Sequence, residues 1–123
     1  MLPKWTETYG RVTLEAVPVP MGNDLCLVIT GGDRPHLGAV ALAQVRPSLE
    51  DSMKVSASTS VLTVPGHKED LLARSAAQSL AARLNRTVVV CCGIHVDAIL
   101  TDELCFVEEA IERLCAFVIE HDG

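Results

Sequence analysis

The sequence predicts an α+β fold in which a mostly antiparallel five-stranded sheet packs with two helices, in one domain spanning residues 1–123. Three observations support this prediction. The first half of the chain holds four apolar or alternating segments joined by short turns, and strands joined in this way usually pair antiparallel. Beyond residue 66 the apolar residues recur at the helical period. A short apolar run and a second helical pattern follow, which gives the order β-β-β-β-α-β-α.

The five strands are expected at residues 10–19, 25–30, 37–45, 54–64 and 87–92. Residues 1–9 are expected to precede them as an N-terminal arm. The first strand alternates apolar with polar residues, as a half-buried strand does, and Pro18 and Pro20 are expected to close it. Alanines occupy alternate positions of the third strand, which predicts that a helix or a ligand approaches that face closely.

The residues that predict the first helix recur every four positions: Leu72, Ala76, Leu80 and Leu84. This helix is expected to start at Gly66 and to have Asn85 as its C-cap. The second helix is expected to have Thr101 as its N-cap. Because two helices leave one face of the sheet uncovered, we expect that apolar face to form a homodimer.

The composition argues against several classes of protein. The formal charge of −6 argues against a general nucleic-acid binder, which would present a basic face. No apolar run approaches the roughly 18–20 residues that span a bilayer, so we expect no membrane partner. The five cysteines form no Cys-x-x-Cys pair and lie mostly in apolar runs. This usage favours a reduced, cytoplasmic location.

Three loops each place a His beside a Gly, next to an apolar segment. The first, GGDRPH, contains Gly31, Gly32, Arg34 and His36. Its backbone N–H groups could wrap a phosphate, and Arg34 would add a planar charged fork. The glycine spacing does not fit a dinucleotide or P-loop fingerprint. A glycine-rich turn with Arg34 facing solvent is an equally good interpretation of this loop.

The second loop, VPGHKED, places Gly66, His67 and Lys68 where the first helix is expected to begin. Free N–H groups and the positive end of the helix dipole favour an anion there, and the two basic residues strengthen the site. The alternative is that Glu69 and Asp70 satisfy the dipole and pair with Lys68.

The third loop, GIHVD, places Gly93, His95 and Asp97 at the exit of an apolar strand. No helix start or hairpin turn requires a His and an Asp at these positions. Two residues apart in an extended segment, they lie on one face, and a carboxylate can fix the tautomer and orientation of an imidazole. The alternative is a structural His satisfied within the core.

The loop histidines also suggest a zinc site. Four side chains are suitable ligand types: His36, His67, His95 and Asp97. None of them belongs to a short ligand pair such as His-x-His. The hypothesis of a cysteine nucleophile has less support than the zinc site. Cys91 and Cys92 lie in the most apolar strand, where burial raises the pKa of a thiol. The sequence contains no complete catalytic set.

The segments ITGGDRPHLGAVALA, VPGHKEDLLARSAAQSLAARLNRTVVV and GIHVDAI together resemble the LpdD-like family, over roughly residues 10–120. These small proteins are encoded with prenylated-flavin-dependent, UbiD-type decarboxylases, including gallate decarboxylase. The resemblance implies a non-catalytic chaperone that binds reduced prenylated FMN and assists its insertion into the decarboxylase. It also implies the fold of the eukaryotic proteasome assembly chaperone pair, formed here as a homodimer.

On this interpretation, the three loops line a cofactor cleft. The histidines and Asp97 would contact the cofactor, and the glycines would let the backbone approach it closely. The phosphate would be held by Arg34, Lys68 and the helix start at Gly66. These roles follow from the chemistry of the residues. Trp5 or Tyr9 would stack on the flavin ring, unless an alanine-lined face holds it. A small His-based metal-dependent enzyme and a chaperone that binds only protein are the alternatives.

Overall fold

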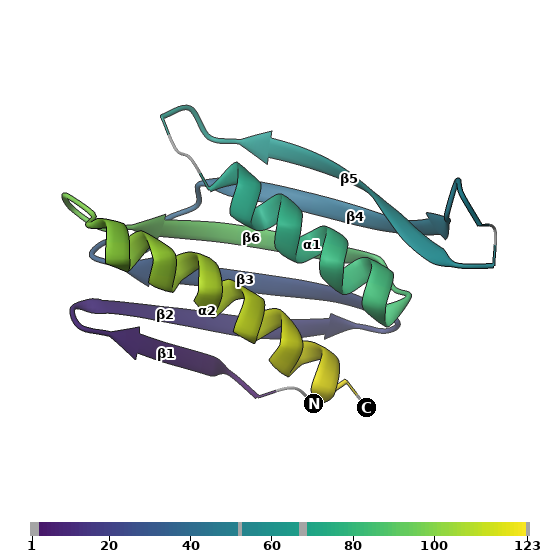
Figure 1. Ribbon diagram of the computed structural model, residues 1–123, viewed down its shortest axis with the longest axis horizontal. Coiled ribbons are helices and arrows are strands. Elements are labelled where there is room, and N and C mark those ends of the chain that lie inside the picture. The colour runs from purple at the N-terminus through teal and green to yellow at the C-terminus, as the bar shows by residue number, and fades with distance from the viewer. Residues whose placement is uncertain (1–2, 52, 67–68, 123) are drawn as a thin grey trace.

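In the computed structural model, which describes residues 3–51, 53–66 and 69–122, six strands form one sheet and two helices cover one of its faces (Figure 1). The elements are β1 (Trp5–Tyr9), β2 (Val12–Met21), β3 (Asp24–Gly32), β4 (Ala39–Pro47), β5 (Val55–Thr63), α1 (Asp70–Leu84), β6 (Val88–His95) and α2 (Thr101–Glu120). The strand order is β1-β2-β3-β6-β4-β5. Among the described residues, no helix is long and apolar enough to cross a membrane.

The sheet differs from the prediction in strand number and in pairing. Residues 5–9, expected to form an arm, pair with β2 as a sixth strand. The strand β6 lies between β3 and β4 and runs parallel to β3, so the sheet is mixed. The prediction of a simple meander was wrong because β6 is apolar on both of its faces, and such a strand is best buried in the middle of a sheet.

The strand β2 also continues beyond the prolines that were expected to close it, through Pro18 and Pro20 to Met21. Within the described residues, β1 pairs with β2 only as far as Ala16. The second half of β2 therefore has an edge without a β1 partner, and proline is tolerated on such an edge because its missing N–H leaves no bond unmade.

The contact between β4 and α1 is built largely from alanine. The alternating alanines of β4 (Ala39, Ala41 and Ala43) are fully buried. They meet α1, whose inner face is formed by Ala73, Ala76, Ala77, Leu80 and Ala81. Small side chains on both surfaces let the helix approach the strand closely. A helix thus occupies the face for which the sequence predicted either a helix or a ligand.

Both helices begin close to the predicted positions. The start of α1 is Asp70, a turn later than Gly66, and Glu69 is its N-cap. Asn85 is the left-handed C-cap that was expected, with a φ of 54°. In α2, Thr101 is the first helical residue, and Leu100 takes the N-cap position expected for Thr101.

Three strands and both helices share one end of the molecule. The strands β3, β5 and β6 run in the same direction, because β3 is parallel to β6 and β4 is antiparallel to both β5 and β6. Their carboxyl ends meet at the left of Figure 1, where α1 and α2 both begin. We call this the helix-start end. Ligands in open α/β sheets commonly bind outside the carboxyl ends of the strands.

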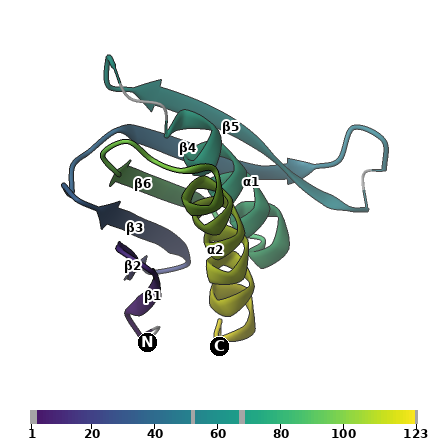
Figure 2. The same cartoon turned by 60° about the vertical axis from the view of Figure 1, so that its left-hand side comes forward.

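The other face of the sheet is not covered by a helix (Figure 2). Two rows of side chains cross it in register: Val17, Val28, Cys91, Val40 and Leu62 in one row, and Val19, Cys26, Val89 and Leu42 in the other. Alternate residues of the same strands face the helices and are buried. We call the surface formed by these two rows the open face.

Candidate functional site

The loop after β3 crosses the end of β6 and brings two of the predicted loops together. The Asp33 N–H donates to the His95 carbonyl over 2.6 Å, and the Gly38 N–H donates to the Cys92 carbonyl over 3.0 Å. Gly93 allows this crossing, because a Cβ built on it would lie 1.6 Å from the His36 carbonyl oxygen. The crossing places the His36 and His95 rings 6.4 Å apart, edge to face.

An exposed cluster of three polar side chains forms beside this crossing. The Asp97 Oδ1 lies 2.8 Å from His95 Nε2 and 3.1 Å from Arg34 Nη2. Arg34 Nη2 also lies 3.1 Å from the same His95 nitrogen. That nitrogen can donate to Asp97 or accept from Arg34, but not both at once. The hydrogen bond from His95, together with Arg34, lowers the pKa of Asp97, so this carboxylate stays ionised.

A second, buried pair lies under the same loop. His36 Nδ1 is 3.0 Å from the Arg34 carbonyl oxygen, which can only accept, so Nδ1 carries a proton. His36 Nε2 lies 2.8 Å from Glu69 Oε1. Glu69 Oε1 also accepts from the Ile94 N–H over 3.3 Å. Glu69, only 6% exposed, therefore joins the start of α1 to the end of β6.

The second oxygen of Glu69 is buried against Gly38. A Cβ at Gly38 would lie 2.2 Å from Glu69 Oε2, so an alanine there would require the carboxylate to move. No described residue forms a hydrogen bond with this oxygen. The sequence analysis assigned Glu69 to the helix dipole and to a pair with Lys68. It missed the contact with His36, because His36 lies 33 residues away.

An ion pair between the exposed Arg11 and the buried Glu103 holds the loop that carries Asp97. Arg11 donates to both carboxylate oxygens of Glu103, over 2.8 and 2.9 Å, and to the Asp97 carbonyl over 2.7 Å. Glu103 also accepts from the Leu100 N–H over 2.9 Å. These bonds lower the pKa of Glu103 from its ordinary value of 4.5 to about 2. The next residue in this loop, Ala98, has a φ of 49°, which a non-glycine residue adopts only under local constraint.

The remaining glycines of the predicted site allow close packing or a positive φ of the backbone. A Cβ at Gly31 would lie 2.4 Å from Leu14 Cδ2, so Gly31 allows β2 to pack closely and does not face the cluster. Gly32 has a φ of 79° and touches the His95 carbonyl at the crossing. Gly66 has a φ of 84° with open space around it. His67 and Lys68 lie outside the described residues.

Two of the alternative chemistries find no support in the described part of the chain. There, no three His, Cys, Asp or Glu side chains are grouped as metal ligands, and the proposed zinc site would need His67, which lies outside it. Burial raises the pKa of Cys92 to about 12, so its thiol is not a nucleophile at neutral pH. Tyr9, suggested as a stacking residue, instead stacks on Phe106 with ring centroids 5.4 Å apart.

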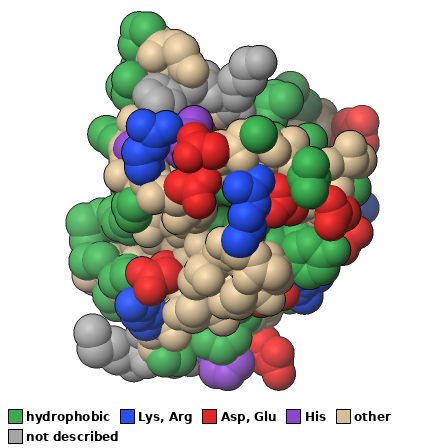
Figure 3. Space-filling view, turned by 90° about the vertical axis from the view of Figure 1, so that its left-hand side faces the viewer, with side chains coloured by type: hydrophobic (Ala, Val, Ile, Leu, Met, Phe, Trp, Pro, Cys, Tyr) green, Lys and Arg blue, Asp and Glu red, His purple; other side chains and the backbone are tan. Residues whose placement is uncertain are grey.

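The helix-start end combines basic, acidic and imidazole groups side by side (Figure 3). Arg34 and Asp97 have side-chain exposures of 71% and 63%, so both are open to a ligand from solvent. The two helix starts add positive dipole ends at the same place. The arrangement can bind an anion through Arg34 and donate hydrogen bonds to a polar ring through the histidines.

The fold is that of an assembly chaperone. A solved structure described as a novel chaperone complex for yeast 20S proteasome assembly matches with a TM-score of 0.59 and 18% sequence identity, over 98% of this chain and 97% of that chain. The family model described as the prenylated flavin chaperone LpdD-like domain matches residues 8–121. The chain therefore belongs to the LpdD-like prenylated flavin chaperone family, and it is a chaperone, not an enzyme. No curated protein matched the sequence.

Proposed function

We propose that this chaperone binds reduced prenylated FMN at the helix-start end and delivers it to a UbiD-type decarboxylase, such as gallate decarboxylase. The observation that carries the proposal is the exposed cluster of Arg34, His95 and Asp97, located where the helices begin and three strands end. Membership of a prenylated flavin chaperone family supports the choice of cargo.

Arg34 is the residue best placed to hold the phosphate. Its guanidinium is exposed and extends from the loop that crosses β6. A phosphate would replace Asp97 as its partner, and an Arg fork binds phosphate oxygens in a bidentate manner. His95 and His36, whose rings lie 6.4 Å apart, could then face polar atoms of the flavin ring.

The competition between Asp97 and phosphate suits a protein that must release its cargo. Asp97 stays ionised beside Arg34, so it can reclaim the guanidinium when the phosphate leaves. This keeps binding weaker than that of a resident cofactor. We place the transfer in the cytoplasm, where the five cysteines, all free in the structure, would remain reduced.

An anaerobic titration tests the proposal. The purified protein is titrated with reduced prenylated FMN and, separately, with reduced FMN, and binding is followed by the absorbance of the flavin. We expect Arg34→Ala to weaken binding by roughly tenfold to a hundredfold, because a charge-assisted hydrogen bond contributes about 1.5–3 kcal/mol. Arg46→Ala, on β4, is the matched control. Absence of flavin binding by the wild type would favour a chaperone that binds only protein.

A further inference from the structure

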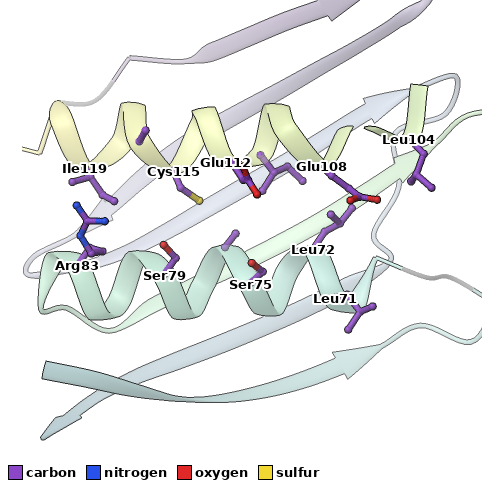
Figure 4. Close-up of a pocket in the computed structure, with 13 residues that line it drawn as sticks. Leu71, Leu72, Ser75, Ser79, Arg83, Leu104, Glu108, Glu112, Cys115 and Ile119 are labelled. Carbon is purple, nitrogen blue, oxygen red and sulfur yellow. The ribbon is translucent and has the colours of Figure 1, made fainter. Parts of the chain in front are cut away.

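A groove runs between α1 and α2 on the outer surface of the helical layer (Figure 4). Its volume is about 650 Å³. Apolar residues form its floor and ends: Leu71, Leu72, Ala76, Leu104, Ile111, Cys115 and Ile119. Leu71 is 71% exposed and Leu104 is 45% exposed, which is unusual for two leucines at the same end of one groove (Figure 4).

The groove exists because the facing residues of the two helices are small. Ser75 and Ser79 on α1 and Ala116 on α2 line it where larger side chains would have closed the gap. The α1 residues Leu71, Ser75, Ser79 and Arg83 repeat every four positions along this wall, as on one side of a helix. Small residues on both walls leave room for the backbone of a third helix to approach closely.

The α2 wall of the groove is acidic. Glu108 and Glu112 are one turn apart and neither forms an ion pair with a described residue. The neighbouring Arg113 is held by Glu7 on β1, over 2.7 Å. Like charges one turn apart destabilise a helix slightly. Arg83, the basic residue of the lining, lies beside Ile119 at the other end of the groove from Glu108 (Figure 4). A second copy with its own two carboxylates against this acidic wall would add like charge, so the wall favours a different, basic occupant.

We propose that the groove receives an amphipathic helix of the client protein, with a stripe of small apolar residues flanked by Lys or Arg facing Glu108 and Glu112. From Leu71 to Arg83 the groove follows about 18 Å of helix, at about 1.5 Å per residue, which suits three to four turns. The inference rests on the proposed chaperone function for the existence of a client.

The position of the groove fits the transfer of a cofactor. Leu71 and Leu104 lie at the starts of α1 and α2, and Leu71 is two residues from Glu69, which contacts His36. A helix in the groove would therefore hold the client beside the Arg34 cluster. Binding of the client and binding of the flavin would use adjoining but separate residues.

The test uses two helix-stapled peptides of about 18 residues, each with the same leucine and alanine stripe. One carries Lys on both flanks of the stripe and the other carries Glu. Fluorescence anisotropy measures their binding to the full chain without flavin. We expect the Lys peptide to bind at least roughly tenfold more tightly than the Glu peptide. The Glu108→Lys/Glu112→Lys variant should reverse this preference.

Two further variants make the result decisive. Glu109→Lys/Glu120→Lys changes the net charge by the same amount on exposed positions of α2 outside the groove, and it should keep the preference for the Lys peptide. Ser79→Trp should fill the groove and abolish binding while circular dichroism shows the native fold.

Equal binding of both peptides, no binding of either, or equal effects of the two charge variants would overturn the proposal. A change of oligomeric state in Glu108→Lys/Glu112→Lys, without peptide binding, would also overturn it and assign the groove to a second copy. Loss of flavin binding with intact peptide binding would contradict the proposed cargo and leave the groove assignment standing.

Discussion

The two histidine–carboxylate pairs of the site differ in how far solvent reaches them. The His36 and Glu69 side chains are 19% and 8% exposed, whereas those of His95 and Asp97 are 39% and 63% exposed. Removing one member of a buried pair leaves the other without a partner, at a cost of about 1–3 kcal/mol. An exposed pair contributes about 0–1 kcal/mol, because water replaces the lost partner. The buried pair should therefore serve stability and the exposed pair should serve binding.

This difference predicts opposite results for two alanine substitutions. His36→Ala should lower the free energy of unfolding by about 1–3 kcal/mol, because it leaves buried Glu69 without its main partner. His95→Ala should change it by less than about 1 kcal/mol but should weaken flavin binding. Urea unfolding and anaerobic titration on the same two samples measure both quantities. A large loss of stability in His95→Ala, with wild-type affinity, would make His95 a structural residue.

Gly93 is the residue on which the site most depends for its shape. In Gly93→Ala the new Cβ would meet the His36 carbonyl, which is backbone and cannot rotate away. We expect a loss of more than about 1–3 kcal/mol together with loss of flavin binding. Gly22→Ala is the control, because Gly22 lies in a turn with open space and only its positive φ of 63° opposes alanine. An equal loss in both variants, measured by urea unfolding, would contradict the crossing seen in the structure.

At the scale of elements, the sequence predicted the segments that have strong local patterns. It did not predict which strands lie beside one another in the sheet. The periodic residues of α1 and α2 and the apolar run of β6 mark these elements by their own composition. No local pattern says that β6 pairs with β3 as well as β4, because the pairing of Leu25 with Val88 joins residues far apart in the chain. The alternation of apolar and polar residues in residues 5–9 is too weak to indicate a strand. These residues form one by pairing with β2.

The same limit explains which parts of the candidate site were missed. The Gly-His loops could be singled out because each is anomalous within its own segment, and the expected contact between His95 and Asp97 is confirmed at 2.8 Å. Their role in binding the cofactor stays a prediction. Glu69 and Glu103 look like ordinary acidic residues of a first helical turn. Their roles depend on partners 33 and 92 residues away, which only the folded chain brings close.

The Arg11–Glu103 pair makes the stability of the α2 start depend on pH. The folded pKa of Glu103 is about 2, below its ordinary value of 4.5. The stabilisation is therefore complete above about pH 4.5 and is lost as the pH falls toward 2. Glu103→Gln should be less stable than the wild type at pH 7, and the difference should shrink between pH 4.5 and pH 2.

Thermal unfolding at a series of pH values measures this difference. Glu109→Gln, which removes an exposed carboxylate from the same helix, is the control and should show little pH-dependent difference. A stability difference between Glu103→Gln and the wild type that stays constant from pH 7 to pH 2 would show that Glu103 does not titrate as the structure requires.

At the scale of the whole molecule, the flavin site, the client groove and the dimer interface are proposed on three separate surfaces. The helix-start end carries the exposed Arg34 cluster, the outer side of the helices carries the groove, and the open face lies on the opposite side of the sheet. Because α1 and α2 begin where β3, β5 and β6 end, the first two surfaces adjoin. The open face adjoins neither helix, so an assembly through it leaves the other two surfaces free.

We propose that the open face forms a homodimer, because one of its apolar rows crosses five strands, the other crosses four, and the helices leave both uncovered. Leu42→Glu would place a charge in this interface and should raise the dimer dissociation constant by roughly a hundredfold or more, since a buried unpaired charge is costly. Leu49→Glu is the control, because Leu49 is 91% exposed and lies between β4 and β5, away from the two rows. Sedimentation at micromolar concentration should give a dimer for the wild type and the control, and a folded monomer for Leu42→Glu. A wild type that sediments as a clean monomer would contradict the proposal.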